Sequence, residues 1–148
     1  MGYEIDNLDR GIMKCLSKDG RMSFTEIASQ LDVTEKTVRL RYKNLIDHGV
    51  MEVVGVVNPT ALGIKSGAII QLKVTSRAIH QAIAALKEIR EVRYITMITG
   101  PYSLLVQIAV PGQEDITSVL YRINDIPCIT EVNTIIQLDV YKNTYDYF

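Results

Sequence analysis

SFTEIASQLDVTEKTVRLRYKNLIDHG, residues 23–49, carries the start signals of two helices that follow each other closely. Ser23 and Glu26 have the spacing of a capping box, so the first helix is expected to begin here. Thr34 is a suitable N-cap for the second helix. Glu35 then places an anion in the first turn, where the helix dipole favours it. The stretch therefore predicts two helices joined by a turn of a few residues.

Apolar residues recur at helical spacing on one side of each expected helix. In the first of the two helices this face consists of Phe24, Ile27, Ala28 and Leu31, and in the second of Val38, Tyr42 and Leu45. An earlier helix has a similar face, formed by Leu8, Ile12, Cys15 and Leu16. A tight turn between two helices defines a helix-turn-helix, so residues 1–50 are predicted to form a helix-turn-helix domain of winged-helix-like type.

The pattern changes after residue 50. Residues 51–65, MEVVGVVNPTALGIK, predict a strand that leads into a linker. Residues 66–148 contain two copies of a strand-helix-strand pattern, of which the first reads SGAIIQLKV, RAIHQAIAALKEI and VRYITMIT, and the second LLVQIAV, EDITSVLYRIND and ITEVNTIIQLDV. This βαββαβ order predicts an α+β fold, a ferredoxin-like sandwich in which both helices cover one face of a four-stranded antiparallel sheet.

The expected strands carry apolar residues on both faces. In SLLVQIAV, residues 103–110, Leu104 and Val106 alternate with Leu105 and Ala109. The two helices cover only one face, so the other needs a second cover, and another subunit is the simplest. We therefore expect a homodimer through the open face of the C-terminal sheet.

Composition limits the class of protein. Of the 148 residues, 47% are hydrophobic and 22% charged, which is typical of a globular chain. The chain has no run of eighteen apolar residues and its N-terminus is acidic, so we expect a soluble, cytoplasmic protein that does not bind membranes. Cys15 and Cys128 lack the spacing of a metal site or disulfide framework and are expected in the core. The formal net charge is only -1, so any nucleic-acid site must depend on local charge.

The order and spacing of these features resemble the Lrp/AsnC family of transcriptional regulators over nearly the whole chain. The matching stretches are IDNLDRGIMKCL, residues 5–16, then DGRMSFTEIASQLDVT, residues 19–34, VRLRYKNLIDHGVM, residues 38–51, the TGPYS loop, residues 99–103, and TIIQL, residues 134–138. The resemblance implies a regulator that binds double-stranded DNA, dimerises through its C-terminal domain and in some cases forms an octamer of four dimers. It also implies a small-molecule effector, an amino acid or related metabolite, and no catalytic cofactor.

Positive charge is concentrated on the third expected helix. Lys36, Arg39 and Lys43 share the side opposite its apolar face, and Thr37 and Arg41 flank them. The N-terminal part of such a helix reaches base edges in the major groove, so Glu35, Lys36, Thr37 and Arg39 are candidate base contacts, and Arg41 and Lys43 candidate phosphate contacts. The full candidate DNA-binding set is Ser23, Thr34, Glu35, Lys36, Thr37, Arg39, Arg41 and Lys43. A solvated helix face, and for Ser23 a capping role alone, remain the alternatives.

The effector region is inferred from the resemblance. The family has a Gly-x-x-Asp pattern beside its effector pocket, and this chain has Gly100-Pro-Tyr-Ser103, so a hydroxyl stands where a carboxylate would pair with a ligand ammonium. The candidate effector residues are Thr99, Gly100, Tyr102, Ser103, Thr130 and Thr134. Threonine and tyrosine are also common in strands, and Gly-Pro is common in turns, so purely structural roles remain open.

Other functions fit the sequence less well. An enzyme is not expected, because the chain has only two histidines and no phosphate loop, paired-carboxylate motif or nucleophile elbow. An RNA-recognition motif shares the βαββαβ order, but SLLVQIAV lacks the stacking aromatics that such a sheet requires. A ligand-sensing or protein-interaction module without DNA binding is the remaining alternative, and salt-dependent binding to duplex DNA distinguishes it from a regulator.

Overall fold

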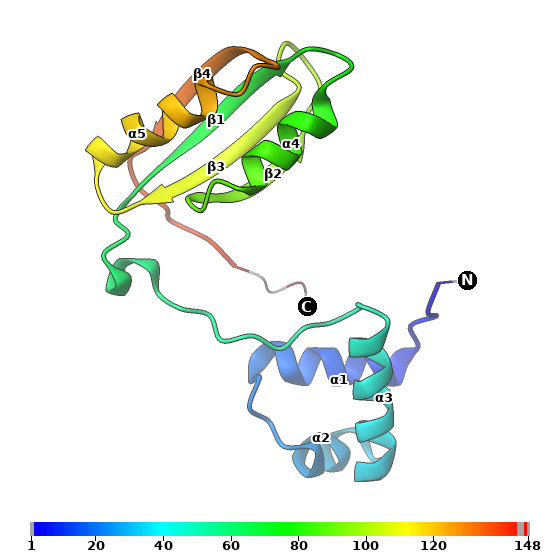
Figure 1. Cartoon of the computed structure of the whole chain (residues 1–148). Coiled ribbons are helices and arrows are strands. Elements are labelled where there is room, and N and C mark those ends of the chain that lie inside the picture. The colour runs from blue at the N-terminus through cyan, green and yellow to red at the C-terminus, as the bar shows by residue number, and fades with distance from the viewer. Residues whose placement is uncertain (1, 145–146, 148) are drawn as a thin grey trace. The chain divides into compact units, whose positions relative to one another are not determined.

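The computed structural model describes residues 2–144 and Tyr147. The described chain folds into two compact units, one made chiefly of residues 2–56 and the other of Val57–Asn143. The first unit is helical and the second combines helices with a sheet, as the ribbon shows (Figure 1). Each unit has its own apolar core.

The N-terminal unit contains three helices whose starts agree with the predicted caps. They are α1 (Asn7–Lys18), α2 (Phe24–Leu31) and α3 (Glu35–Asp47). The backbone N–H of Glu26 donates to Ser23 Oγ at 3.2 Å and the carboxylate of Glu26 accepts from the Ser23 N–H at 2.9 Å, which is the predicted capping box. Thr34 caps α3 by accepting from the Thr37 N–H at 3.2 Å. These caps fix where α2 and α3 begin.

The predicted apolar faces meet in one core. Ile12, Ile27, Val38 and Leu45 have no exposed surface, so α1, α2 and α3 each bury at least one large side chain. Asp32, at the end of α2, has a left-handed conformation with φ 53°. This conformation lets the chain turn directly into the cap of α3. The prediction of a helix-turn-helix is confirmed.

Residues 51–58 differ from their predicted structure. They have no secondary structure, and the 3₁₀ turn Pro59–Leu62 follows them. Val54, Val56 and Val57 are all exposed. The strand expected in residues 51–65 is therefore wrong for the single chain. A strand forms only when a neighbouring strand accepts and donates its backbone hydrogen bonds, and no described residue pairs with this segment in the sheet.

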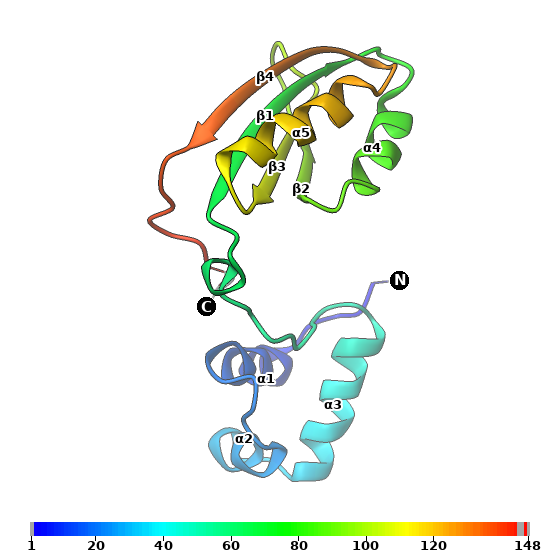
Figure 2. The ribbon, with the colours of Figure 1, turned by 60° about the vertical axis from the view of Figure 1, so that its left-hand side comes forward.

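The C-terminal unit has the predicted βαββαβ order. Its elements are β1 (Ser66–Val74), α4 (Ile79–Lys87), β2 (Val92–Met97), β3 (Leu104–Val110), α5 (Gln113–Asn124) and β4 (Ile129–Gln137). The strands form one sheet in the order β2-β3-β1-β4, and all neighbours are antiparallel. Figures 1 and 2 show α4 and α5 on the same face of this sheet. The predicted ferredoxin-like fold is confirmed.

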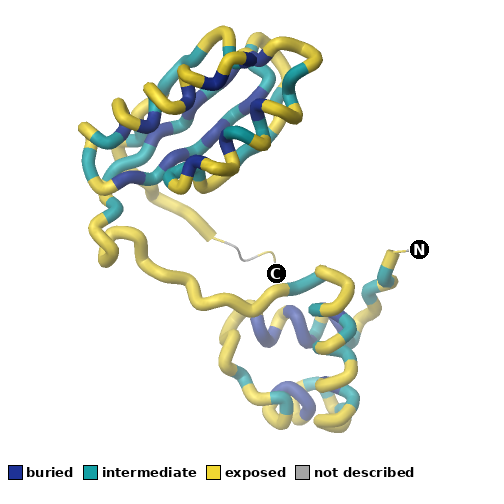
Figure 3. The backbone as a smooth tube through the Cα atoms, viewed as in Figure 1, coloured by how far each residue is buried: buried dark blue, intermediate teal, exposed yellow. Residues whose placement is uncertain are grey.

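Burial alternates along the central strands. In β3, Leu104, Val106 and Ile108 are fully buried, whereas Leu105 and Ala109 are half-buried. The buried positions are concentrated where the helices cover the sheet (Figure 3). A period of two along a strand places these two sets on opposite faces, so the helix-covered face holds the core.

The open face of the sheet is less apolar than the sequence suggested. Leu105 lies on it, but Asn133 Nδ2 donates to Gln71 Oε1 at 2.8 Å and Gln107 Nε2 donates to Gln137 Oε1 at 3.1 Å. These amide pairs join β1 to β4 and β3 to β4 across the face. The open face therefore alternates apolar patches with paired polar groups, a composition that is common in interfaces between protein molecules.

Both cysteines lie in apolar cores, Cys15 in the N-terminal unit and Cys128 in the C-terminal unit, as predicted. Within residues 2–144 and Tyr147, no group of three or more His, Cys, Asp or Glu side chains is arranged to hold a metal ion. None of the described helices is long and apolar enough to cross a membrane.

Candidate DNA-binding and effector sites

Helix α3 exposes the three cations of the predicted stripe. Lys36, Arg39 and Lys43 are all exposed, whereas Val38 and Leu45 on the same helix are fully buried. In the part of the chain that the structure describes, Lys36 and Lys43 form no ion pair. Their ammonium groups are thus accessible to an external anion.

Arg39 is held in place by residues from two helices. Its Nη2 lies 2.6 Å from Glu35 Oε1, one turn earlier on α3, and its Cζ lies 5.1 Å from the ring centroid of Phe24 on α2. The second carboxylate oxygen of Glu35 accepts from the hydroxyl of Thr25 at 3.0 Å. The hydrogen bond from Arg39, and then the one from Thr25, lower the pKa of Glu35, which stays ionised at neutral pH.

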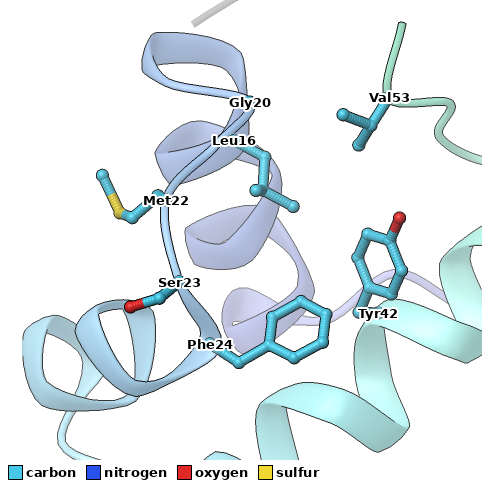
Figure 4. A pocket seen from close by; sticks show the side chains of 7 residues that line it. All are labelled: Leu16, Gly20, Met22, Ser23, Phe24, Tyr42 and Val53. Carbon is cyan, nitrogen blue, oxygen red and sulfur yellow. The ribbon is translucent and has the colours of Figure 1, made fainter.

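The ring of Phe24 packs against the ring of Tyr42. The rings of Phe24 and Tyr42 have centroids 5.0 Å apart and planes tilted by 52°. Both side chains border an open hollow of about 300 Å³ (Figure 4), whose lining consists of Leu16, Gly20, Met22, Ser23, Phe24, Tyr42 and Val53. None of these seven residues is a carboxylate, amine or imidazole, so this surface hollow between the three helices and Val53 offers no charged side chain to a ligand.

Arg41 has a different environment from the one predicted. Its Nη1 lies 2.8 Å from Asp6 Oδ2 and 3.4 Å from Asp9 Oδ2, and its side chain is only 33% exposed. Asp9 is fully buried and also accepts from the hydroxyl of Tyr3 at 3.1 Å. The guanidinium therefore neutralises carboxylates at the start of α1. The expectation that Arg41 contacts phosphate is not supported by this geometry, because its charge is already used inside the domain.

The hydroxyls among the predicted DNA contacts are engaged in helix starts. Ser23 Oγ accepts from the Glu26 N–H and donates to Glu26 Oε2 at 2.7 Å. The hydrogen bonds that the Ser23 hydroxyl and then the Ser23 backbone N–H donate to the Glu26 carboxylate lower the pKa of Glu26. The hydroxyls of Thr34 and Thr37 lie 2.8 Å apart. Capping thus accounts for Ser23 and Thr34, and Thr37 is the one of the three that lies within α3.

The loop between β2 and β3 brings one predicted effector residue next to two residues that the sequence analysis missed. Tyr102 donates from its hydroxyl to Glu131 Oε1 at 2.9 Å, and Lys73 Nζ donates to Glu131 Oε2 at 2.7 Å. The hydrogen bond from Lys73 lowers the pKa of Glu131, and the hydrogen bond to Glu131 raises the pKa of Tyr102. Opposite charges on two strands were the available signal, but Lys73 and Glu131 become cross-strand neighbours only once the register of β1 and β4 is known.

The remaining candidates do not form a single cluster. Gly100, with φ 107°, turns the loop, and the Ser103 backbone N–H donates to the Leu72 carbonyl at 2.9 Å. Thr130 donates from its hydroxyl to the Lys73 carbonyl at 3.2 Å, close to the Tyr102 group. Thr99 is exposed at the loop.

Thr134 lies on the other side of the sheet. It is the register partner of Ile70, which is fully buried beneath the helices, and partners in an antiparallel pair point to the same face. The structure therefore separates Thr134 from Glu131 and Tyr102.

Comparison with protein families gives two matches that together span both units. The AsnC-type helix-turn-helix domain matches residues 5–46, and the Lrp/AsnC ligand binding domain matches residues 67–147. The chain belongs to the Lrp/AsnC family. The second match alone covers more than half of the chain, and the predicted resemblance is confirmed.

Individual members of the Lrp/AsnC family are similar over almost their whole length. The HTH-type transcriptional regulator FL11 of Pyrococcus abyssi is 32% identical over 97% of this chain and 96% of its own, and FL11 of Pyrococcus furiosus is 30% identical over 95% and 93%. The structure of E. coli AsnC matches with a TM-score of 0.88 at 29% identity, covering 95% of this chain and 97% of AsnC. These relatives are transcriptional regulators and not enzymes, so the protein is a helix-turn-helix transcriptional regulator with a ligand-binding domain.

Proposed function

We propose that this Lrp/AsnC regulator binds duplex DNA by inserting α3 into the major groove. The observation that carries the proposal is the exposure of Lys36, Arg39 and Lys43 on the side of α3 opposite its buried face. The second helix of a helix-turn-helix reads the major groove with its N-terminal residues. Lys36, Thr37 and Arg39 lie in that half of α3 and are the proposed base contacts, and Lys43 is the proposed phosphate contact.

The proposed DNA-binding unit is a homodimer formed through the open face of the sheet. The face has half-buried apolar residues such as Leu105 beside amide pairs, which fits a surface that another subunit covers. A two-fold dimer presents two copies of α3, so the operator is expected to be pseudo-palindromic with half-sites about one helical turn apart. We further propose that dimers assemble into an octamer. The mass measured by light scattering at micromolar concentration distinguishes a monomer, a dimer and an octamer.

An amino acid or a related metabolite is the proposed effector. The domain match is to a ligand-binding domain, and the NMB0573 regulator of Neisseria meningitidis, which has the same fold at 19% identity and a TM-score of 0.86, has been crystallised in complex with L-Met. We place the site at the loop of Gly100, Tyr102 and Ser103, where the Lys73–Glu131 ion pair supplies both signs of charge. A zwitterion has an ammonium and a carboxylate that match these signs. Calorimetric titration with the twenty amino acids tests whether an amino acid is the effector.

The salt dependence of binding tests the DNA-binding proposal. The slope of log K against log salt concentration changes by about 0.9 for each phosphate contact, so Lys43→Ala in a dimer should reduce the slope by about 2. Lys87→Ala is a matched control, because this lysine is exposed on α4 of the C-terminal unit. A wild-type protein without salt-dependent binding to duplex DNA contradicts the proposal and favours a protein-interaction module. Equal slopes for the two variants contradict the phosphate contact of Lys43.

A further inference from the structure

Arg39 differs from the lysines of α3 because it contacts the side chains of Glu35 and Phe24, and Thr25 in turn holds Glu35. Its Nη2 lies 2.6 Å from Glu35 Oε1, its Cζ lies 5.1 Å from the ring centroid of Phe24, and Thr25 donates to the second oxygen of Glu35 at 3.0 Å. We infer that Phe24, Thr25 and Glu35 position Arg39 to read a guanine, and that they thereby determine operator specificity without themselves contacting that base. The inference rests on the proposed DNA-binding function.

An ordinary surface ion pair does not explain this arrangement. Glu35 and Arg39 are one turn apart on α3, which by itself is a common helix pair of little consequence. However, Phe24 and Thr25 come from α2, so two helices contribute to the orientation of one exposed side chain. Both oxygens of Glu35 are occupied, one by Arg39 and one by Thr25. The carboxylate is therefore a fixed support rather than a free acceptor.

Orientation matters for an arginine that reads a base. Bidentate donation to O6 and N7 of guanine requires the plane of the guanidinium to match the plane of the base. A free arginine loses much side-chain entropy when it adopts one orientation. In this protein Nη2 is bonded to Glu35 and Cζ lies over the ring of Phe24, yet the Arg39 side chain remains 65% exposed, so its other N–H donors are accessible. The Arg39 side chain is thus preorganised for contact with a base in the free protein.

The same support makes Arg39 a poor general phosphate contact. Glu35 cancels much of its charge and places an anion near the DNA backbone, where phosphates repel it. Lys36 and Lys43 have no such counter-ion among the described residues. The cations of α3 are therefore expected to have two different roles in DNA binding. The lysines contribute affinity for any duplex, and Arg39 with its three positioning residues contributes discrimination.

The test begins with a duplex selected from a random pool by the wild-type protein, compared with a scrambled duplex of the same composition. Glu35→Ala should weaken binding to the selected duplex by about 3- to 10-fold and leave binding to the scrambled duplex equal or tighter, because a repelling anion is removed. Glu35→Gln, which keeps one acceptor for Arg39, should give an intermediate loss. Opposite changes for the two duplexes do not result from misfolding.

An atom of the base provides a second readout. Replacing guanine by 7-deazaguanine removes the N7 acceptor, and the position at which wild type loses binding but Arg39→Ala does not identifies the guanine that Arg39 reads. At that position Glu35→Ala and Phe24→Leu should be less sensitive than wild type. Glu35→Ala in the Arg39→Ala background should cause no further loss of discrimination, because a positioning residue acts only through the residue it positions.

Each outcome has a distinct meaning. If wild type selects no duplex, the proposed DNA-binding function fails. If wild type discriminates through Arg39 but Glu35→Ala and Phe24→Leu keep its full discrimination and N7 sensitivity, the positioning inference is wrong and the DNA-binding function stands. Because Phe24 also packs against Tyr42, a loss confined to Phe24→Leu would reflect packing and would equally overturn the inference. Glu35 is exposed, so its replacement tests the inference without endangering the fold.

Discussion

Replacing Arg41 by alanine is expected to weaken the folding of the N-terminal unit and to spare direct contact with DNA. Arg41 neutralises Asp9, which has no exposed surface, and Asp6 at the start of α1. Without the guanidinium, the buried carboxylate of Asp9 keeps only its hydrogen bonds from Tyr3 and from the Asp6 backbone N–H. The variant therefore leaves a buried charge without a counter-ion, which is one of the more damaging changes in a protein core.

The size of the effect follows from the contacts that remain. Removing one partner of a fully buried ion pair costs about 3–5 kcal/mol. Arg41 is one-third exposed and Asp9 keeps two hydrogen bonds, so the expected loss in the free energy of unfolding is smaller, about 2–3 kcal/mol. Such a loss corresponds to about 30- to 150-fold in an equilibrium constant.

Peptide-resolved hydrogen exchange measures this loss in the full-length protein. Amides of α1 and α3 should exchange about 30- to 150-fold faster in Arg41→Ala, while amides of β1 and β3 in the other unit keep their rates. Arg39→Ala is the matched control, since the same residue type on the same helix lies on the exposed side. That variant should leave exchange unchanged and weaken binding to a selected operator by roughly tenfold or more.

Two results would refute this reasoning. Exchange in α1 and α3 that rises less than about threefold would show that the pair of Arg41 with Asp9 has little energetic weight. A decrease in the salt slope of DNA binding for Arg41→Ala, with unchanged exchange, would show that Arg41 contacts phosphate after all.

Three further predictions concern stability. Leu45→Ala, at a fully buried site, should lower the free energy of unfolding of the helical unit by about 2–5 kcal/mol, measured by the same exchange experiment. The pKa values of Asp6 and Glu26 are lowered in the folded protein, so their stabilisation is present above pH about 4 and is lost as pH falls further, which denaturation at a series of pH values would show. Gly100→Ala, at φ 107°, should cost about 1–3 kcal/mol of local strain and speed exchange of the Ser103 amide.

Features that depend on neighbouring residues could be predicted from the sequence. The starts of α2 and α3 follow from caps in which Ser23 and Thr34 bond to groups three positions later. The faces of the helices and of β3 follow from periods of 3.6 and 2 along the chain. These interactions join residues that are only a few positions apart, so the local sequence is enough to predict them.

Features that depend on contacts between distant residues could not be predicted from the sequence. Arg41 has the same spacing pattern as a phosphate contact, but its partner Asp9 is 32 positions away, and nothing local indicates that the two meet. Lys73 and Glu131 are 58 positions apart and become neighbours through the register of β1 with β4. The valines of residues 51–58 have a strong preference for strands, yet a strand also requires a partner that local preference does not supply.

The sequence by itself determined the three N-terminal helices, the βαββαβ order of the C-terminal unit and the cationic side of α3, because helix capping and apolar periodicity are local. Only the tertiary structure decided which charges remain accessible. It buried Asp9 and paired Arg41 with it, left Lys36 and Lys43 without a described counter-ion, and brought Phe24 of α2 against Arg39 of α3. An arginine that pairs with a buried carboxylate is held by its own domain, whereas an exposed pair such as Arg39 with Glu35 can still reach a partner, and the distant residues that the fold brings together decide between the two.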